Sequence, residues 1–259
     1  ASYFEGAFAW LYYADRLYQL PLGVVGIAIG IVLLPELSRA LINKNSLDGQ
    51  NAFNRALEFS LLLTIPAAVA LIIIPLSLIS VIFERGAFTN LDTISTSQAL
   101  AIYGLGLPAF VLQKVLQPLF FAREDTRSPF IFALLAMFLN VSLAICLSFY
   151  VGFLAAAIGT SISSWVMIFL LWNGCKKMGD SSRIDARLKR NLPFIILSSI
   201  LMGMVIYIVQ YFLNNSLHTP NIRYLMLTIL IFSGIISYLF FINLFGIIPK
   251  QGLRAMIKK

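Results

Sequence analysis

The chain has 259 residues, of which 59% are hydrophobic and only 12% are charged, with a formal net charge of +8. This composition excludes a soluble globular domain, and the long apolar runs without alternation favour membrane-spanning helices over a barrel. In a membrane protein such positive charge is typical of cytoplasmic loops, so we expect membrane lipids as partners and no nucleic acid.

Seven stretches are apolar and long enough to cross a hydrocarbon core of about 30 Å, which takes roughly 20 helical residues. The predicted fold is an all-α bundle of about seven transmembrane helices. Pro66 and Pro75 are expected to break the second stretch. Ser128 is expected to cap the fourth, with Pro129 as its first helical residue. The predicted spans are 8–40, 53–83, 94–121, 129–150, 152–174, 193–213 and 223–247.

The first span carries Asp15 and Arg16 side by side within apolar sequence. A charge at bilayer depth costs about 2.5–3.5 kcal/mol, so such residues usually face a bundle interior or a wet cavity. We therefore predict a functional face on this helix, with a bend at Pro21. The structural alternative is that Asp15 and Arg16 pair with other helices and that glycines serve packing. Spacings of three and four define that face as Tyr12, Arg16, Gln19, Gly23, Gly26 and Gly30.

The basic residues gather on one side of the predicted bundle. All but four of the 19 Lys and Arg residues lie in the loops after spans one, three and five or at the C-terminus. Arg85 and Arg223 lie on the opposite side, and Arg16 and Lys114 lie inside spans. The positive-inside rule then places residue 1 outside and residue 259 in the cytoplasm.

The longest polar break, residues 175–192, separates five spans from a final pair. We predict three parts: 1–174 as a five-span unit, 175–192 as a basic, partly helical cytoplasmic loop, and 193–259 as the final pair with a cytoplasmic tail. A solvated charged loop is a sufficient explanation for 175–192. Because the chain lacks an initiator Met and turns apolar almost at once, Ala1 is expected to be a cut inside a longer protein.

The sequence holds no pattern that indicates catalysis. It has no HExxH metal motif and no glycine-rich phosphate loop after a strand. Cys146 and Cys175 lie in or beside apolar runs and form no metal or disulfide pattern. The lone His218 lies in an outer loop and receives no role. We therefore expect a protein that is not an enzyme.

Six short motifs occur in a fixed order along the first 129 residues. Together they resemble the MurJ/MviN family of lipid II flippases, and the resemblance covers about residues 8–174. The final pair of spans matches by hydropathy and position. The motifs are YADRLYQLPLG at 13–23, LLPELSR at 33–39, LTIPAAV at 63–69, FERGAFT at 83–89, YGLGLP at 103–108 and FAREDTRSP at 121–129.

The resemblance implies a multidrug/oligosaccharidyl-lipid/polysaccharide exporter with fourteen helices in two lobes plus a final pair. The seven spans would be helices eight to fourteen, so the amino-terminal lobe and the first helix of this lobe would be missing. Such proteins move undecaprenyl-pyrophosphate-linked peptidoglycan precursor across the bacterial inner membrane by alternating access. The implied partners are lipid II, the missing lobe and other cell-wall synthesis proteins.

By the same resemblance, Arg16 matches the cavity arginine for the anionic headgroup, and Asp15 is the adjacent acid expected to hold it in place. Gln19 shares their face. Lys114, in the middle of span three, either lines the cavity or forms a structural ion pair. Glu58 departs from the family pattern, which places a basic residue nearby, and a contact with Arg55 is the simplest account of it.

Asn140 and Thr160 match positions given to a sodium site in some family members, and oxygen ligands suit a hard cation. Ala144 stands where a second acid would help, so an interhelical hydrogen bond is the alternative role for Asn140. No organic cofactor is implied, and sodium or the membrane potential would drive coupling. Two other functions compete with the flippase: another exporter of the superfamily, for O-antigen lipid or drugs, and a membrane enzyme acting on isoprenoid pyrophosphates.

Overall fold

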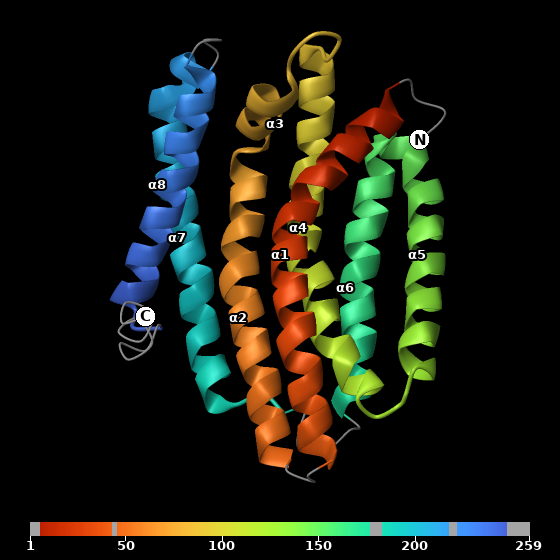
Figure 1. The fold of residues 1–259 in the computed structure, drawn as a ribbon. Coiled ribbons are helices and arrows are strands. Elements are labelled where there is room, and N and C mark those ends of the chain that lie inside the picture. Colours follow the sequence, from red (N-terminus) through yellow and green to blue (C-terminus); the bar gives the residue numbers. More distant parts are fainter. Residues whose placement is uncertain (1–5, 43–45, 177–182, 218–221, 248–259) are drawn as a thin grey trace.

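The computed structural model describes residues 6–42, 46–176, 183–217 and 222–247, with side chains except at 28–34, 37–38, 40–42, 46 and 214–217. The described ranges contain eight helices and no strand, which confirms the all-α prediction (Figure 1). Six of them, α2 and α4 to α8, are long and apolar enough to cross a membrane, which supports the second to seventh predicted spans, whereas α1, the first predicted span, is not among the six found in the described residues. The helices are α1 (Ala7–Ile42), α2 (Ser46–Ile73), α3 (Pro75–Phe83), α4 (Asn90–Phe121), α5 (Arg127–Val151), α6 (Leu154–Lys176), α7 (Ala186–Leu217) and α8 (Arg223–Leu244).

The second predicted span consists of two helices. Ile74 leaves the helical conformation, with φ −117° and ψ 35°, and Pro75 then begins α3. The short α3 leaves the axis of α2 at this point (Figure 1). The break predicted at Pro75 is therefore confirmed, because proline suits the first position of a new helix.

The break predicted at Pro66 is wrong, since α2 runs through this residue. Proline has no N–H to donate to the carbonyl four residues earlier, which here belongs to Leu62. The hydroxyl of Tyr238 on α8 donates a hydrogen bond to that carbonyl instead. A side chain from another helix thus satisfies the backbone group that Pro66 leaves open, and α2 continues.

Two other helix starts differ from the sequence prediction. α5 begins at Arg127, and the residue before it, Thr126, makes no side-chain cap. Asp125 supplies that contact, because its Oδ1 accepts the backbone N–H of Ser128 at 2.9 Å. The hydrogen bonds from Ser128 lower the pKa of Asp125.

α7 begins at Ala186, so the last residues of the predicted 175–192 loop form its first turns.

The first helix is α1, a single helix of 36 residues that contains Pro21 and Pro35. Its early part is inclined to its later part (Figure 1), as expected for a helix with an internal proline. Its predicted limits, 8–40, agree with the observed Ala7–Ile42 to within two residues. This helix carries the predicted functional face.

The core is centred on α4, the most buried of the six candidate spans. α4 packs against α1, α2 and α6, and a continuous cluster of buried side chains from these helices includes Phe53, Leu100, Leu107 and Leu171. Three hydrogen bonds also link α6 and α4: Ser161 Oγ to the Ile102 carbonyl, Trp165 Nε1 to the Leu105 carbonyl, and Gln113 Nε2 to the Ser164 carbonyl.

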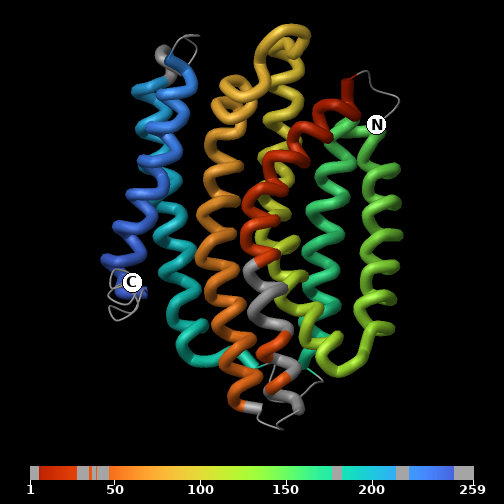
Figure 2. The backbone as a smooth tube through the Cα atoms, viewed as in Figure 1, coloured from red at the N-terminus to blue at the C-terminus, as the bar shows by residue number. Residues whose placement is uncertain are grey.

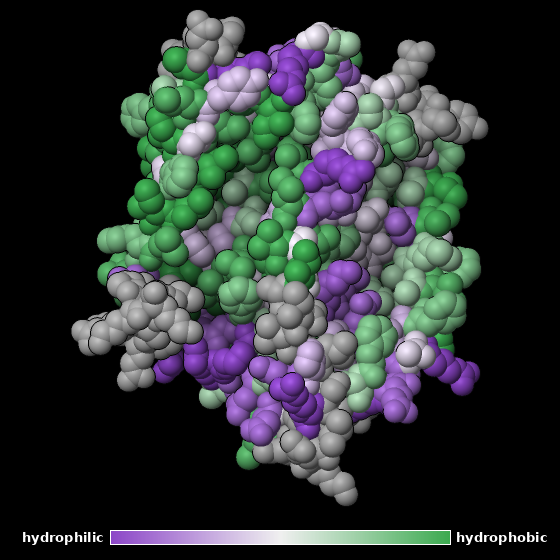
Figure 3. Space-filling view, in the orientation of Figure 1, coloured by the Kyte–Doolittle hydropathy of each residue, from purple (hydrophilic) through white to green (hydrophobic). Residues whose placement is uncertain are grey.

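The two flanks of the bundle are built differently. α5 packs almost entirely on α6, whereas α7 and α8 pack on each other and on α2 and α3 around a second apolar cluster that includes Ile74 and Ile195 (Figure 2). Hydrophobic side chains cover most of the face in view (Figure 3), as a lipid-facing surface requires. Hydrophilic side chains interrupt this apolar surface where α1 runs, which draws attention to that helix.

Candidate functional site

The polar part of α1 is exposed at Arg16. The Arg16 Nη2 donates a hydrogen bond of 2.7 Å to the Tyr12 hydroxyl, one turn earlier. Its guanidinium carbon also lies 4.7 Å from the centre of the Tyr12 ring, a cation–π contact. Both side chains are exposed. Arg16 is thus held by its own helix and keeps other donors free for a ligand.

Asp15 does not pair with Arg16 among the described side chains. It accepts a hydrogen bond from Gln19 Nε2, one turn later on the same helix. Adjacent helical residues point in different directions, so neither an orienting bond from Asp15 nor an ion pair with Arg16 forms. The alternative that both residues pair with other helices is not what the structure shows either, because their hydrogen-bond partners among the described residues lie on α1.

Tyr12, Arg16 and Gln19 form a polar row on α1. Buried aromatic rings fix α1 against α4 behind this polar row. Tyr18 lies with its ring centre 4.9 Å from that of Tyr103 and 5.2 Å from that of Phe110. Tyr18 is 8% exposed, whereas Gln19 beside it is exposed. The rotation of α1 about its axis is therefore set by apolar packing, and the polar row is left on the open side.

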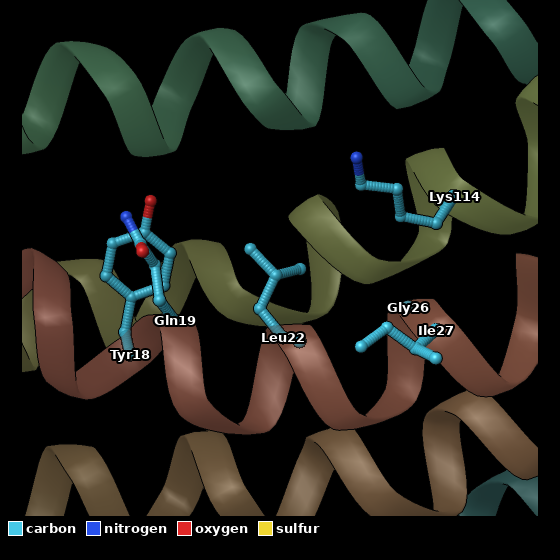
Figure 4. Close-up of a pocket in the computed structure, with 7 residues that line it drawn as sticks. Tyr18, Gln19, Leu22, Gly26, Ile27 and Lys114 are labelled. Atoms are coloured by element: carbon cyan, nitrogen blue, oxygen red, sulfur yellow. The ribbon is translucent and has the colours of Figure 1, made fainter.

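A pocket of about 460 Å³ continues this row between α1 and α4. Lys114 arises from α4, and the other labelled residues arise from α1 (Figure 4). Gly26 gives Lys114 its room, since the Lys114 Cγ lies 3.9 Å from the position of a β-carbon on Gly26. The lining residues are Tyr18, Gln19, Leu22, Gly23, Gly26, Ile27 and Lys114.

Lys114 is exposed to this pocket and forms no ion pair with any carboxylate that the structure describes. Of its two predicted roles, cavity lining fits the structure and the ion pair does not. Arg16 and Asp15 do not line the pocket itself. They lie one turn beyond Gln19 on the same helix, so the predicted face is continuous from Tyr12 to Gly26, and Gly30 lies outside the described side chains.

The two residues proposed for sodium lie at one level of the α5–α6 contact. Asn140 Oδ1 lies 2.7 Å from the position of a β-carbon on Gly159, the residue before Thr160. The Thr160 hydroxyl donates to the Ala156 carbonyl of its own helix at 2.8 Å. No group of three or more His, Cys, Asp or Glu side chains that could hold a metal occurs in the described part of the chain. The sodium site therefore stays a prediction.

Glu58 does contact Arg55, as predicted, but the pair belongs to a larger polar network between α2 and α7. Arg55 also pairs with Asp185, and Glu58 accepts Arg187 Nε at 3.2 Å. Glu58 Oε1 further accepts Asn191 Nδ2 at 2.6 Å. This set, called the α2–α7 network below, includes residues from the region that the sequence analysis treated as a solvated loop.

The sequence pattern does not predict the α2–α7 network, and neighbouring contacts extend it. Asn54 Nδ2 donates to the Arg183 carbonyl at 2.8 Å, and the Asp185 N–H donates to Asn54 Oδ1 at 2.9 Å. Two sequence features could have indicated this network. One is the polar cluster at the start of span two, and the other is an Asp within an otherwise basic loop. His218, to which no role was assigned, lies outside the described residues.

Comparison with known proteins decides the family. The profile described as "Lipid II flippase MurJ" matches residues 1–242. The chain belongs to the MurJ family of lipid II flippases. It is 46% identical to a probable lipid II flippase MurJ of Rhizobium meliloti over 210 residues, or 80% of this chain and 39% of that protein. The Vibrio cholerae protein of the same description is 31% identical over 256 residues, or 97% of this chain and 48% of its own length.

A solved structure supports the same assignment. The chain resembles "Lipid II flippase MurJ, inward closed conformation" with a TM-score of 0.78 and 30% identity, over 94% of this chain and 48% of that one. The predicted MurJ family membership is therefore confirmed. The chain spans about half the length of the MurJ relatives it matches, and its candidate spans make it a multi-pass membrane protein.

Proposed function

We propose that this chain is the carboxy-terminal half of a lipid II flippase of the bacterial inner membrane, and that Arg16 and Lys114 contact the pyrophosphate of the lipid. The observation that carries this proposal is the continuous face of α1 with Arg16 at one end and the Lys114–glycine pocket at the other. A guanidinium can grip a pyrophosphate through two parallel donors, and an ammonium adds a point charge.

Each part of this face has a distinct task in the proposal. Gln19, between Arg16 and the pocket, offers amide groups to the sugar–peptide headgroup. The bare backbone at Gly23 and Gly26 leaves space for bulky substituents, since no heavy atom lies within 4 Å of a β-carbon on Gly23. Asp15, held by Gln19, moderates the positive charge of this region while the site is empty.

The polyprenyl tail has a separate candidate site. By the family resemblance, the last two spans would form a lipid-facing groove for this tail. An apolar pocket of about 610 Å³ lies instead between α2 and α7, and α8 does not line it. We propose that this pocket takes part of the tail, because its lining is almost wholly apolar. The lining residues are Val69, Ile73, Ile200, Gly203, Met204, Tyr207 and Ile208.

Transport in this proposal requires alternating access between two lobes, of which this chain supplies one. The 259-residue chain alone should therefore not move lipid II in liposomes, and robust flipping by it would contradict the proposal. Transport could be coupled to sodium through Asn140 and Thr160 or to the membrane potential. Replacing sodium with choline at a fixed membrane potential would distinguish these two driving forces.

The decisive experiment is complementation of a flippase-depleted bacterial strain by the full-length protein that carries this chain. Growth with normal cell shape is expected. Rescue of O-antigen export without rescue of cell-wall synthesis would support the other exporter function instead. Because the relatives are flippases by description, we propose no catalytic step. Turnover of an isoprenoid pyrophosphate by the purified full-length protein would contradict the proposal that it catalyses no reaction.

A further inference from the structure

Two arginines meet at the end of the bundle opposite the α2–α7 network. Arg85 lies in the connection between α3 and α4, and Arg223 is the first residue of α8 (Figure 1). Arg223 Nη2 donates to the Tyr224 hydroxyl at 3.1 Å, and its guanidinium carbon lies 5.0 Å from the centre of the Tyr224 ring. Arg223 Nη1 also donates to the backbone carbonyl of Glu84, the residue before Arg85, at 3.2 Å. The two arginines therefore lie near each other at this end of the bundle.

No carboxylate described in the structure neutralises either arginine. The nearest acid in sequence, Glu84, accepts a hydrogen bond from Thr93 at 3.0 Å, and only its backbone carbonyl contacts Arg223, at 3.2 Å. Asp92 is occupied by Trp10 at 2.6 Å and by Thr89. Two like charges held together without an acid repel each other, so an external anion would stabilise the arrangement.

The backbone and the Arg223 side chain add two further unmet donors. Ile222 precedes α8 and has no side chain that could cap the helix, and no side chain in the described part of the chain is seen to cap the first N–H groups of α8. A helix start carries partial positive charge, which disfavours a cation such as Arg223 there unless an anion is bound. The Arg223 Nε has no hydrogen-bond partner among the described residues and is buried, so Arg223 could reach a ligand only through its Nη groups. The positive charge at this helix start favours an anion.

We propose that Arg85, Arg223, Tyr224 and the start of α8 bind the phosphate group of a membrane lipid in the leaflet at this end of the bundle. Guanidinium groups recognise phosphate oxygens through paired donors. Tyr224 is an exposed aromatic residue at a span end, the position that aromatic side chains favour at the headgroup level. Arg85 also lines a pocket of about 530 Å³ with Trp10 and Tyr13, which leaves room for the rest of a headgroup. Asp92 lines the same pocket, and its carboxylate is held by Trp10 and Thr89.

The test uses the full-length protein, purified in detergent, with native mass spectrometry to count bound lipids. The probes are phosphatidylglycerol, a polyprenyl pyrophosphate, and zwitterionic phosphatidylcholine as reference. The Arg85→Gln and Arg223→Gln variants, singly and combined, are compared with Arg127→Gln at the opposite end of the bundle. Gln at 223 keeps an amide donor for the Glu84 carbonyl. The Arg85 side chain makes no hydrogen bond to the described backbone, and its carbonyl, which accepts the Phe88 N–H at 3.2 Å, is kept in Arg85→Gln. Arg85→Gln therefore tests binding without disturbing packing.

The double variant is expected to lose at least tenfold in affinity for one anionic probe, because both guanidinium groups lose their charge-assisted hydrogen bonds to the phosphate. Loss confined to phosphatidylglycerol identifies a bulk lipid, and loss confined to the polyprenyl pyrophosphate identifies a substrate-like lipid. Equal binding of both anionic probes by the wild type, Arg85→Gln and the double variant would overturn the proposal, as would an equal loss in Arg127→Gln.

Discussion

Lys114 of α4 lies over Gly26 of α1, with its Cγ 3.9 Å from the position that a β-carbon on Gly26 would take. That separation is ordinary van der Waals contact, so an alanine fits at position 26 and a large side chain would displace Lys114. The glycine thus keeps open the space in which the ammonium group can reach a ligand.

Gly26→Phe should fill the pocket and abolish complementation of a flippase-depleted strain, whereas Gly26→Ala should remain active. Alanine also favours the helix by about 1 kcal/mol over glycine, so expression should not fall. Ala133→Phe, on an exposed part of α5, is the matched control for added bulk. Normal growth with well-expressed Gly26→Phe would remove this pocket from the substrate path.

Arg16→Ala should abolish function in the full-length protein without preventing insertion, because removing a charge makes insertion easier. Arg16→Lys keeps the charge but loses the paired donors, so it should be impaired. Each lost charge-assisted bond of about 1.5–3 kcal/mol weakens binding tenfold or more. Asp15→Asn should be milder, since Asp15 bonds Gln19 and not Arg16. Complementation with expression checked by blot measures all three, and a well-expressed, fully active Arg16→Ala would refute the assignment.

Glu58→Gln should destabilise the contact between α2 and α7. The Glu58 side chain is 8% exposed and its partners Arg55 and Arg187 are 37% and 44% exposed, so solvent screens the pairs in part. We expect a loss of about 1–3 kcal/mol, seen as a lower thermal unfolding temperature of the purified full-length protein. Glu124→Gln, in the exposed turn after α4, should leave that temperature unchanged. A Glu58→Gln protein as stable as the wild type would mean that the network adds nothing to stability.

A cysteine at Ser182, which lies outside the described residues, should resist an impermeant thiol reagent in intact cells. The reason is the concentration of Lys and Arg on that side of the bundle. A cysteine at Asn90, exposed at the start of α4, should react in the same cells. Both would be placed in a protein in which Cys146 and Cys175 are replaced by serine. The reverse labelling pattern would show that the orientation is inverted.

Tyr238→Phe should destabilise the protein by about 1 kcal/mol, because the Leu62 carbonyl would lose its donor within the membrane-spanning bundle. Tyr207→Phe is the matched control, since Tyr207 is exposed and its hydroxyl makes no hydrogen bond within the described part of the chain. Thermal unfolding of the purified full-length protein in detergent provides the comparison. An unchanged unfolding temperature for Tyr238→Phe would show that Leu62 finds another donor.

The sequence predicts the membrane spans well because hydropathy and helix length are local properties of a segment. It also places Arg16, Gln19, Gly23 and Gly26 on one face, since that depends only on the helical repeat. It cannot state how α1 is rotated against α4. That rotation follows from the packing of Tyr18 on Tyr103 and Phe110, and it leaves Arg16 and Gln19 exposed.

Contacts between distant segments escape the sequence analysis for the same reason. Asn191 and Glu58 are separated by 133 residues, so the α2–α7 network becomes visible only when the two helices lie together. The charges near 185–191 therefore suggested a solvated loop. Lys114 is an intermediate case, because its mid-span position indicated importance while its glycine neighbour on α1 could not be predicted from spacing.

The hydrogen bond from Tyr238 to the Leu62 carbonyl ties the choice of residue at position 238 to the choice at position 66, 172 positions away in the chain. A protein with alanine at 66 would supply its own N–H to Leu62 and would not need a hydroxyl on α8. Pro66→Ala combined with Tyr238→Phe should therefore be less harmful than Tyr238→Phe alone. Among related proteins, proline at position 66 should accompany a hydrogen-bond donor at position 238. Loss of either feature should permit loss of the other.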